Sequence, residues 1–380
     1  MKLVQLGQVA EIEMGQAPSG DTYNENGDGL PLIAGASDFG ELTPHPSRFT
    51  SHPTKKSKNG DILICIRATI GNLNWSDSEY CLGRGVAGLR AKEGIIAPQY
   101  LWRVMEAGAD RLAAKGRGAT FRQVTRTDIA ELEIPLPPLN EQMRIAAILD
   151  QADKLRRLRQ SSIDRLNELG QAIFYEMFGD PATNPMGWPM GTIGDLTEST
   201  QYGTSSKAGN EGSIPILRMG NITTTGEFEF QDMKFIDLLE NEIDKYTVKD
   251  GDILFNRTNS PDLVGKTGVY RGEKTYAYAG YLIRLRTNKE AVPEYIGTYL
   301  NSKVGKKILR GMCKTIIGMA NINAKELRTI PIPLAPIELQ KKFQRKFVAY
   351  RSAIPAFQKH REHLDTLFSS LQHREFHGEM

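Results

Sequence analysis

The chain has 380 residues, more than one hydrophobic core usually serves, so two domains are expected. Hydrophobic residues make up 40% and charged residues 24%, which excludes a disordered or fibrous chain. The net charge of +3 lacks the basic excess of many nucleic-acid-binding proteins. Because no signal-peptide pattern or apolar span of about eighteen residues occurs, we expect a cytoplasmic protein. Cys65, Cys81 and Cys313 form no CxxC pair, which argues against a disulfide framework or a thiolate metal site.

The first predicted domain covers residues 1–138 and mixes short apolar runs with Gly, Asn and Asp turns. Ile62–Ile66 has the length of a strand and leads to Arg67. Pro98 stands where a helix would begin. This pattern predicts an α+β fold with a mainly antiparallel sheet.

A long helix is predicted next, within residues 139–180. After Pro138 the chain has no proline up to Phe178 and is rich in helix-forming residues. Apolar residues recur every three or four positions, which is typical of a coiled coil. The predicted contact positions are Ile148, Ala152, Leu155, Leu166, Leu169 and Ile173.

The second predicted domain, residues 185–335, repeats the first. Gly60-Asp61-Ile62-Leu63 recurs as Gly251-Asp252-Ile253-Leu254, and aligning Arg67 with Arg257 requires one deletion. Ile134-Pro135-Leu136-Pro137-Pro138 recurs as Ile332-Pro333-Leu334-Ala335-Pro336. Spacing between the copies is constant from these prolines through Phe178 and Phe376 and varies before them. The chain is therefore a tandem duplication with variable domains and invariant helices.

The second long helix is predicted within residues 336–380. Its contact positions are Tyr350, Phe357, Leu364, Leu367 and Leu371. Pro355 should kink it or divide it in two. Each long helix has an apolar face to bury, so we expect an antiparallel intramolecular pair that relates the two domains by a pseudo-twofold axis.

Three motifs that could have had a chemical role are incomplete or lack the structural context that the role needs. Gly83-Arg84-Gly85-Val86-Ala87-Gly88 matches GxGxxG, but no helix is predicted after it. Gly265-Lys266-Thr267 lacks the earlier glycine of a phosphate-binding loop. The histidine pairs near the C-terminus have no further metal ligands beside them. We expect no catalytic residues and no metal.

Basic residues gather locally in both domains, although neither domain is basic overall. Residues 303, 307, 310 and 314 would share one helical face. Such clusters fit a phosphate backbone, and a solvated helix face is the alternative interpretation. The candidate DNA-binding residues are Lys55, Lys56, Lys58, Arg67, Lys115, Arg117, Arg122, Arg126, Arg218, Arg257, Lys266, Lys306, Lys307, Arg310 and Lys314.

Together, the paired proline segments, the helices after them and the Gly-Asp-Ile-Leu strands resemble the specificity subunit of a type I restriction-modification system. The resemblance covers almost the whole chain and departs from the family pattern at Ala335, Leu339 and Pro355. It implies two target-recognition domains that read the halves of an interrupted, asymmetric DNA site, with helices that set the spacer. The subunit itself would be non-catalytic. It would dock two methyltransferase subunits and restriction subunits, which would use S-adenosylmethionine, ATP and Mg.

Two other classes stay open from the residues alone. A stand-alone two-domain DNA-binding regulator would bind DNA without a methyltransferase and leave genome methylation unchanged. A protein-interaction scaffold would use the coiled coil and bind no DNA, so its basic clusters would be dispensable.

Overall fold

The computed structural model describes residues 2–118, 122–260, 263–316 and 319–377, without the side chains of 314–316, 319 and 377. The chain divides into two compact units. The first unit is Met1–Arg159 with His360–Met380, and the second unit is Gln160–Lys359. Each unit therefore contains one globular domain and segments of both long helices.

The first unit is built around a four-stranded antiparallel sheet in the order β2-β9-β6-β7. All four residues of β6 are buried, which suits its β-branched sequence. A smaller sheet has the order β3-β5-β4-β8, in which β4 and β8 are parallel. The strands are β1 (Leu3–Gln5), β2 (Ala10–Met14), β3 (Tyr23–Asn24), β4 (Leu30–Ile33), β5 (Phe49–Thr50), β6 (Ile62–Cys65), β7 (Leu73–Trp75), β8 (Cys81–Leu82), β9 (Val86–Ala91) and β10 (Glu133–Pro135).

Four helices complete this domain: α1 (Leu6–Val9), α2 (Pro98–Ala107), α3 (Ala109–Ala114) and α4 (Arg126–Ala130). Pro98 begins α2, as predicted, because its fixed backbone angle suits a first helical turn. Thr125 caps α4 by accepting a hydrogen bond from the Asp128 backbone N–H. The core lies between α2 and the β6 sheet and includes Ile64 and Leu101.

The second unit repeats this plan. Its main sheet has the order β12-β19-β15-β17 and is antiparallel. Smaller sheets have the orders β14-β13-β18 and β16-β21-β20. The strands are β11 (Met190–Thr192), β12 (Thr197–Tyr202), β13 (Ile214–Leu217), β14 (Lys234–Ile236), β15 (Ile253–Asn256), β16 (Thr258–Asn259), β17 (Thr267–Val269), β18 (Ala277–Tyr278), β19 (Leu282–Thr287), β20 (Lys314–Ile316), β21 (Met319–Asn321) and β22 (Pro331–Pro333). Its helices are α6 (Glu240–Tyr246), α7 (Pro293–Asn301), α8 (Lys303–Met312) and α9 (Ala324–Arg328). The predicted α+β class is confirmed.

The proline segments close both domains in the same way. In the first unit β10 pairs with β1, and the Pro135 carbonyl accepts a hydrogen bond from the Tyr100 hydroxyl at 2.9 Å. In the second unit β22 pairs with β11, and the Pro333 carbonyl accepts one from the Tyr295 hydroxyl at 2.7 Å. The two tyrosines align in the sequence repeat, so the repeat is also structural.

A buried glutamine in the first turn of each long helix makes a second repeated contact. Gln142 accepts a hydrogen bond from the Ala97 N–H at 2.8 Å and donates to the carbonyls of Ile95 and Pro137. Gln340 accepts from Val292 and donates to Glu290 and Ala335. One side chain therefore satisfies two backbone groups just before α2 or α7 and one just before the long helix, and so joins the two helices.

Replacing Gln142 with alanine is expected to lower the unfolding free energy of the first unit by about 1–3 kcal/mol, because buried backbone groups lose their partners. Hydrogen exchange in α2 would report the change. Gln340→Ala should act in the same way on α7, whereas Gln151→Ala, on the exposed side of the same helix as Gln142, should change little. Equal exchange rates for α2 in the Gln142 and Gln151 variants would contradict the assignment.

The long helices are α5 (Leu139–Phe178), α10 (Ile337–Arg351) and α11 (Ile354–His377). The second helix is therefore divided in two, as Pro355 predicts, because proline near the start of α11 cannot donate a backbone hydrogen bond into α10. None of the helices in the described part of the chain is long and apolar enough to cross a membrane.

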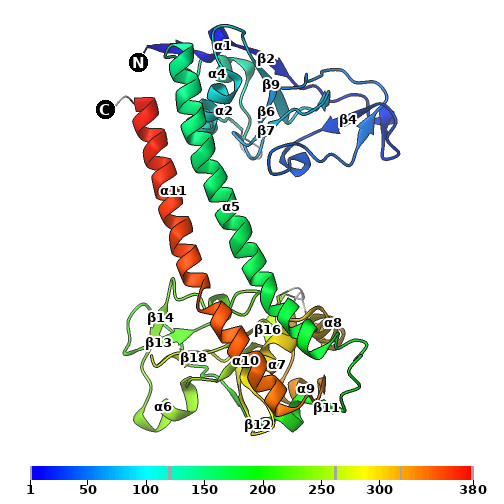
Figure 1. Cartoon of the computed structure of the whole chain (residues 1–380), viewed down its shortest axis with the longest axis vertical. Coiled ribbons are helices and arrows are strands. Elements are labelled where there is room, and N and C mark those ends of the chain that lie inside the picture. Colours follow the sequence, from blue (N-terminus) through cyan, green and yellow to red (C-terminus); the bar gives the residue numbers. More distant parts are fainter. Residues whose placement is uncertain (1, 119–121, 261–262, 317–318, 378–380) are drawn as a thin grey trace. The chain divides into compact units, whose positions relative to one another are not determined.

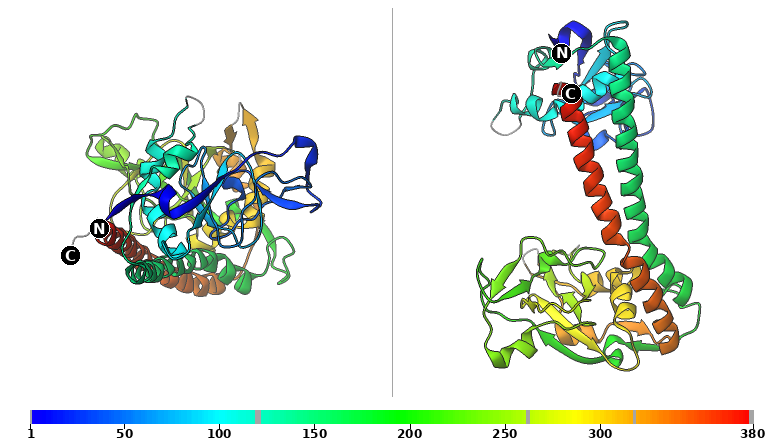
Figure 2. Two further views of the ribbon diagram at one scale, coloured as in Figure 1. Left: turned by 90° about the horizontal axis from the view of Figure 1, so that it is seen from above. Right: turned by 60° about the vertical axis from the view of Figure 1, so that its left-hand side comes forward.

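Within the first unit, α5 and α11 lie side by side and run antiparallel (Figure 1, Figure 2). Arg144, near the start of α5, pairs with Glu375, near the end of α11, at 2.7 Å. Arg156, further along α5, pairs with Asp365 at 2.7 Å. Ion pairs therefore contribute much of this helix contact, where the sequence predicted a run of apolar residues.

Within the second unit, α5 packs against α10 through aromatic rings. Phe174 and Phe178 lie 5.7 and 5.4 Å from the Phe343 ring, and both also contact Tyr295. Gly170 lies so close to Tyr350 that an added Cβ would stand 2.1 Å from the tyrosine oxygen. The end of α5 thus belongs to the core of the second domain, while the end of α11 contributes Phe368 to the core of the first.

The predicted coiled-coil positions are only partly correct. Ala152 is buried, and the positions that are partly buried are Ile148, Leu166, Ile173, Tyr350, Phe357, Leu364 and Leu371. The prediction is wrong at Leu155, Leu169 and Leu367, which are exposed. A straight helix has 3.6 residues per turn, so a stripe drawn every 3.5 residues leaves the contact face over forty residues.

Candidate nucleic-acid interface

The first unit has a basic hollow of about 480 Å³ lined by Arg48, Arg67 and Arg84. Backbone of the β3–β4 region and glycines of the turn before β9 form much of its wall. None of the described residues that line it is acidic. We call it the Arg67 hollow. Its positive charge and its exposed guanidinium groups fit a DNA backbone or the edge of a base.

Local backbone geometry holds the arginines of this hollow in place. Arg67 follows β6 and forms an isolated bridge with Gln123. Ala68 has a φ of 56°, which a non-glycine residue adopts at an energetic cost. Arg84 is in the turn between β8 and β9, beside Gly85, where an added Cβ would lie 2.2 Å from the Ala34 carbonyl oxygen. The tight turn therefore presents Arg84 outward.

The corresponding face of the second unit is built differently. Arg257 follows β15 and lies over the Tyr202 ring at 4.9 Å, and it donates a hydrogen bond to the Asn321 side chain at 3.2 Å. The Arg257 Nε and both amide atoms of the buried Asn256 have no hydrogen-bond partner. Buried polar groups normally have partners, so these atoms beside the Arg257 guanidinium depart from the usual pattern.

Three cations lie next to this face on the loop before β17 and on α8. Lys266 is 8% exposed, and Lys306 donates a hydrogen bond to the Gly265 carbonyl at 2.8 Å. Burial, together with the nearby charges of Lys266 and Arg310, lowers the pKa of Lys306 to about 8. Burial lowers the pKa of Lys266 as well. An ammonium group whose charge is disfavoured by burial and by neighbouring cations is one that a phosphate would stabilise.

The affinity of the chain for a non-specific duplex is expected to fall up to about tenfold between about pH 7 and pH 9, as Lys306 loses its proton. Its folded-state pKa lies below the unfolded value, so unfolding takes up a proton and stability rises over this window. DNA affinity and stability should therefore change in opposite directions. Fluorescence anisotropy and urea unfolding measure the two quantities.

Lys306→Met should remove most of the pH dependence of binding. Lys307→Met changes an exposed lysine of the same helix and should keep that dependence. A pH profile that is the same in wild type and Lys306→Met would show that Lys306 does not face DNA.

The expected pairing of Arg67 with Arg257 is wrong. Ile66 accepts a backbone hydrogen bond from Val124, and Arg257 accepts the equivalent one from Ile322. Arg257 therefore occupies the place of Ile66, without the deletion that the sequence alignment required. The two domains present different side chains at the same point of the fold.

The other candidate DNA-binding residues of the first unit lie at its surface, and their contact with DNA stays a prediction. Lys55 and Lys56 pair with Glu13 and Glu79, acids that are distant in the sequence. Arg117 pairs with Asp128, and Lys115 donates to the Asp128 carbonyl. The remaining candidates, Lys58, Arg122 and Arg126, are exposed.

In the second unit, Arg218 donates to the Asp232 carbonyl, while Lys307 and Arg310 are exposed on α8. The predicted helical face that included Lys314 is wrong, because α8 ends at Met312 and Lys314 is in strand β20. The Lys314 side chain lies outside the described residues.

Sequence reasoning missed Arg84 and undervalued Arg48. Arg84 stands in the glycine-rich run that resembles a nucleotide-binding motif, and strand β9 follows it where that motif needs a helix. An arginine between two glycines was the only available signal. Arg48 belongs to a basic segment, but it lies near Arg67 only because of how β5, which follows Arg48, and β6, which precedes Arg67, are placed.

Two copies of one α+β domain, each with a basic face and each followed by long helices, define a duplicated protein with two candidate nucleic-acid interfaces. A family model described as "Type I restriction modification DNA specificity domain" matches residues 1–168 and again residues 185–361. The chain therefore belongs to the type I restriction-modification DNA specificity family.

Individual relatives agree with this assignment. The chain is 32% identical over 174 residues to a putative type I restriction enzyme MjaX specificity subunit of Methanocaldococcus jannaschii, covering 45% of this chain and 41% of that protein. It is 27% identical over 256 residues to the type I restriction enzyme EcoKI specificity subunit of Escherichia coli, covering 62% and 54%. The matches thus span about half the length of these relatives.

Solved structures share the fold. The crystal structure of the type I restriction-modification S subunit from M. genitalium superposes with a TM-score of 0.62 at 15% identity, covering 99% of this chain and 96% of that one. A second chain, from a study of complex assembly and conformational transition of the type I system, gives 0.57 at 18% identity and covers 99% and 97%. At these identities the likeness concerns the fold alone.

Proposed function

We propose that this chain is the non-catalytic DNA-recognition subunit of a type I restriction-modification complex. Each target-recognition domain reads one half of an interrupted, asymmetric site, and the helices α5, α10 and α11 set the spacer between the halves. Similar half-sites on one side of a duplex would have centres about one helical turn, roughly 34 Å, apart.

One observation carries this proposal: the two domains share a glutamine contact to their long helices but have different basic faces. Gln142 and Gln340 join the segments before α2 and α7 to the long helices by equivalent hydrogen bonds, so this contact is repeated in both domains. The basic faces differ, with the Arg67 hollow in one unit and Arg257 over Tyr202 in the other. Two domains that share a contact to their helices but present different residues to DNA fit an asymmetric, two-part target.

The helices also support docking of partner subunits. On α5, Leu155 and Leu158 are each more than half exposed and are three residues apart, so they are neighbours on one face of the helix. Met143 is exposed as well, further toward the start of the helix. We assign this surface to two methyltransferase subunits, with restriction subunits joining the assembly. S-adenosylmethionine, ATP and Mg would be bound by these partners. DNA affinity of the isolated chain should be weak and should rise when the methyltransferase is added.

Methylome sequencing of host cells with and without the gene tests the proposal. Loss of methylation at one interrupted, asymmetric motif in the deletion strain is the expected result. Unchanged methylation in a host whose methyltransferase is active would contradict it. Selective DNA occupancy by the chain alone, together with unchanged methylation, would instead identify a stand-alone regulator.

A further inference from the structure

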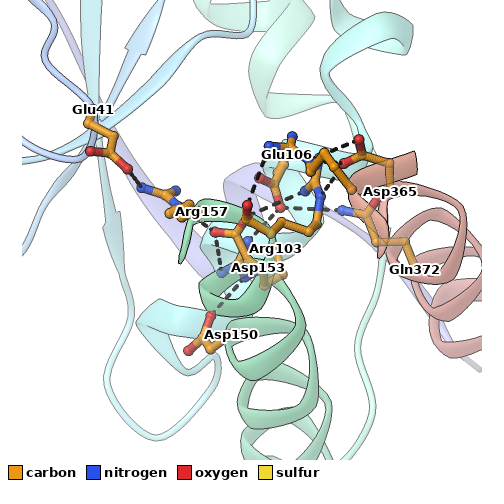
Figure 3. A network of polar contacts seen from close by, with 10 residues as sticks. Glu41, Arg103, Glu106, Asp150, Asp153, Arg157, Asp365 and Gln372 are labelled. Atoms are coloured by element: carbon orange, nitrogen blue, oxygen red, sulfur yellow. Dashed lines mark hydrogen bonds and ion pairs between the residues drawn. The ribbon is translucent and has the colours of Figure 1, made fainter. Parts of the chain in front are cut away.

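A buried arginine joins α2 of the first domain to α5. Arg103, on α2, is 5% exposed. Its guanidinium group contacts Glu106 at 2.8 Å on its own helix, and Asp150 at 2.8 Å and Asp153 at 3.3 Å on α5 (Figure 3). One side chain thus makes ion pairs to three carboxylates from two helices.

The contacts continue to α11. Arg156 of α5 pairs with Asp365 of α11 at 2.7 Å and lies 4.3 Å from the centre of the Phe368 ring, over which Arg103 also lies. Gln372 of α11 donates a hydrogen bond to Glu106 at 3.3 Å. We call these residues the Arg103 network. It holds α2 against both long helices through contacts that depend on direction as well as distance.

The second unit has a cavity at the equivalent place. The repeat aligns Trp102, Arg103 and Phe368 with Gly297, Thr298 and Gly170. These three small residues line a cavity of about 130 Å³. The first domain also has a hollow beside α5, of about 390 Å³, lined in part by Trp102, Glu106 and Arg157. The two units therefore differ in the contacts that cross to α5, because among the described residues only the first has a buried arginine there.

Polar groups around this cavity do not replace the network. The buried Thr298 Oγ1 and the Gln171 Oε1 have no hydrogen-bond partner. Arg351, in the place of Asp153, pairs with Glu227 of a loop. Among the residues that the structure describes, no ion pair links α7 to α5 or α10. Two side-chain amides hold α7 instead: Gln344 of α10 donates to Glu294 at its start, and Gln171 of α5 donates to the Thr298 carbonyl at 3.0 Å.

We propose that Arg103 is a positioning residue for DNA recognition, which fixes the orientation of the first target-recognition domain on its helices and so makes spacer reading strict. The inference rests on the proposed function. The second domain has Thr298 in place of this arginine and packs on its helices mainly through the rings of Phe174 and Phe343, which are contacts that depend less on direction.

The geometry of DNA explains why orientation matters. Adding one base pair to a spacer moves the next half-site by about 3.4 Å along the axis and rotates it by roughly a tenth of a turn. A domain that can tilt relative to its long helices can still reach a half-site that has been displaced in this way. A domain held by several directional charge contacts cannot, because any tilt separates buried opposite charges.

The test compares methylation of duplexes whose spacer is the native length, one base pair shorter or one longer, using the complete methyltransferase complex and the motif found by methylome sequencing. Arg103→Met is expected to lower the preference for the native spacer about tenfold, equivalent to about 1.4 kcal/mol. Arg103→Lys, which keeps the charge, should recover part of it.

Arg90→Met is the matched control. Arg90 pairs with the buried Asp61 at 2.7 Å within the sheet of the same unit, away from the helices. It should lower stability and keep the spacer preference within about twofold of wild type. Thr298→Val, at the equivalent position of the second unit, should also keep it.

A folded Arg103→Met complex with the wild-type spacer preference would overturn the inference. If that variant does not fold, Arg103→Met with Glu106→Gln replaces it, since Glu106 loses its ion pair in the single variant whereas Asp153 keeps Arg156 and Arg157. Absence of any two-part motif in wild-type cells would instead refute the proposed function, so the two failures are distinguishable.

Discussion

Phe174→Ala is expected to lower the unfolding free energy of the second unit by about 3–5 kcal/mol, which is a large part of the stability of a typical domain. Phe174 is fully buried at the end of α5 and lies 5.0 Å from Phe178 and 5.5 Å from Tyr295, ring centre to ring centre. Its loss would leave a cavity between α5, α7 and α10. Hydrogen exchange resolved by segment would show faster exchange in α7 and β15.

The control is Leu158→Ala on the same helix, where the side chain is 55% exposed. A change within about 0.5 kcal/mol is expected there. The first unit should keep its exchange rates in the Phe174 variant, because Phe174 packs only with residues of the second unit in the described core. Equal destabilisation by both variants would mean that the end of α5 is not part of that core.

Much of the fold could be predicted because its signals are local. The constant spacing from the proline segments onward reflects β10, β22 and the helices, which tolerate no insertion. Pro355 divides the second helix through its missing N–H alone. Duplication, fold class and helix positions all follow from such signals.

Contacts between distant segments could not be predicted. Leu155 has the spacing of a core residue, yet Arg103 and Asp153 occupy the contact face instead, because α2 packs there. The sequence of α5 does not show which face the domain covers. The end of α11 completes a core that begins at Leu6, on the far side of the sequence, which only the packing of Phe368 reveals. The end of α5 joins Phe343 and Phe347 of α10 in the core of the second domain.

The candidate site was predictable only in part for the same reason. Arg67 follows a recognisable strand, whereas its neighbours Arg48 and Arg84 come from other strands and turns. The predicted equivalence of Arg67 and Arg257 was wrong because it rested on residue identity alone. The backbone hydrogen bonds place Arg257 at the position in the second domain that Ile66 has in the first. A residue type found at a strand end does not establish a shared role.

Arg67→Gln and Arg84→Gln are expected to weaken binding of the methyltransferase complex to its target by about 1–3 kcal/mol each, or roughly tenfold or more. Both guanidinium groups line the Arg67 hollow, where none of the described lining residues is acidic, so under the proposed function we expect them to contact DNA. Filter binding against duplexes with the native motif measures the loss. Arg111→Gln, an exposed arginine on α3 of the same unit, should bind within about twofold of wild type.

The type of loss separates the two possible roles of each arginine. A phosphate contact weakens binding to all sequences and lowers the slope of affinity against salt by about one. A base contact relaxes one position of the first half-site in the methylome and leaves the second half-site unchanged. Arg67 is next to Ala68, whose backbone is strained, and Arg84 is in a tight glycine turn. We therefore expect Arg67 to read a base and Arg84 to bind phosphate. Unchanged affinity and an unchanged motif in both variants would place the DNA on another face of the domain.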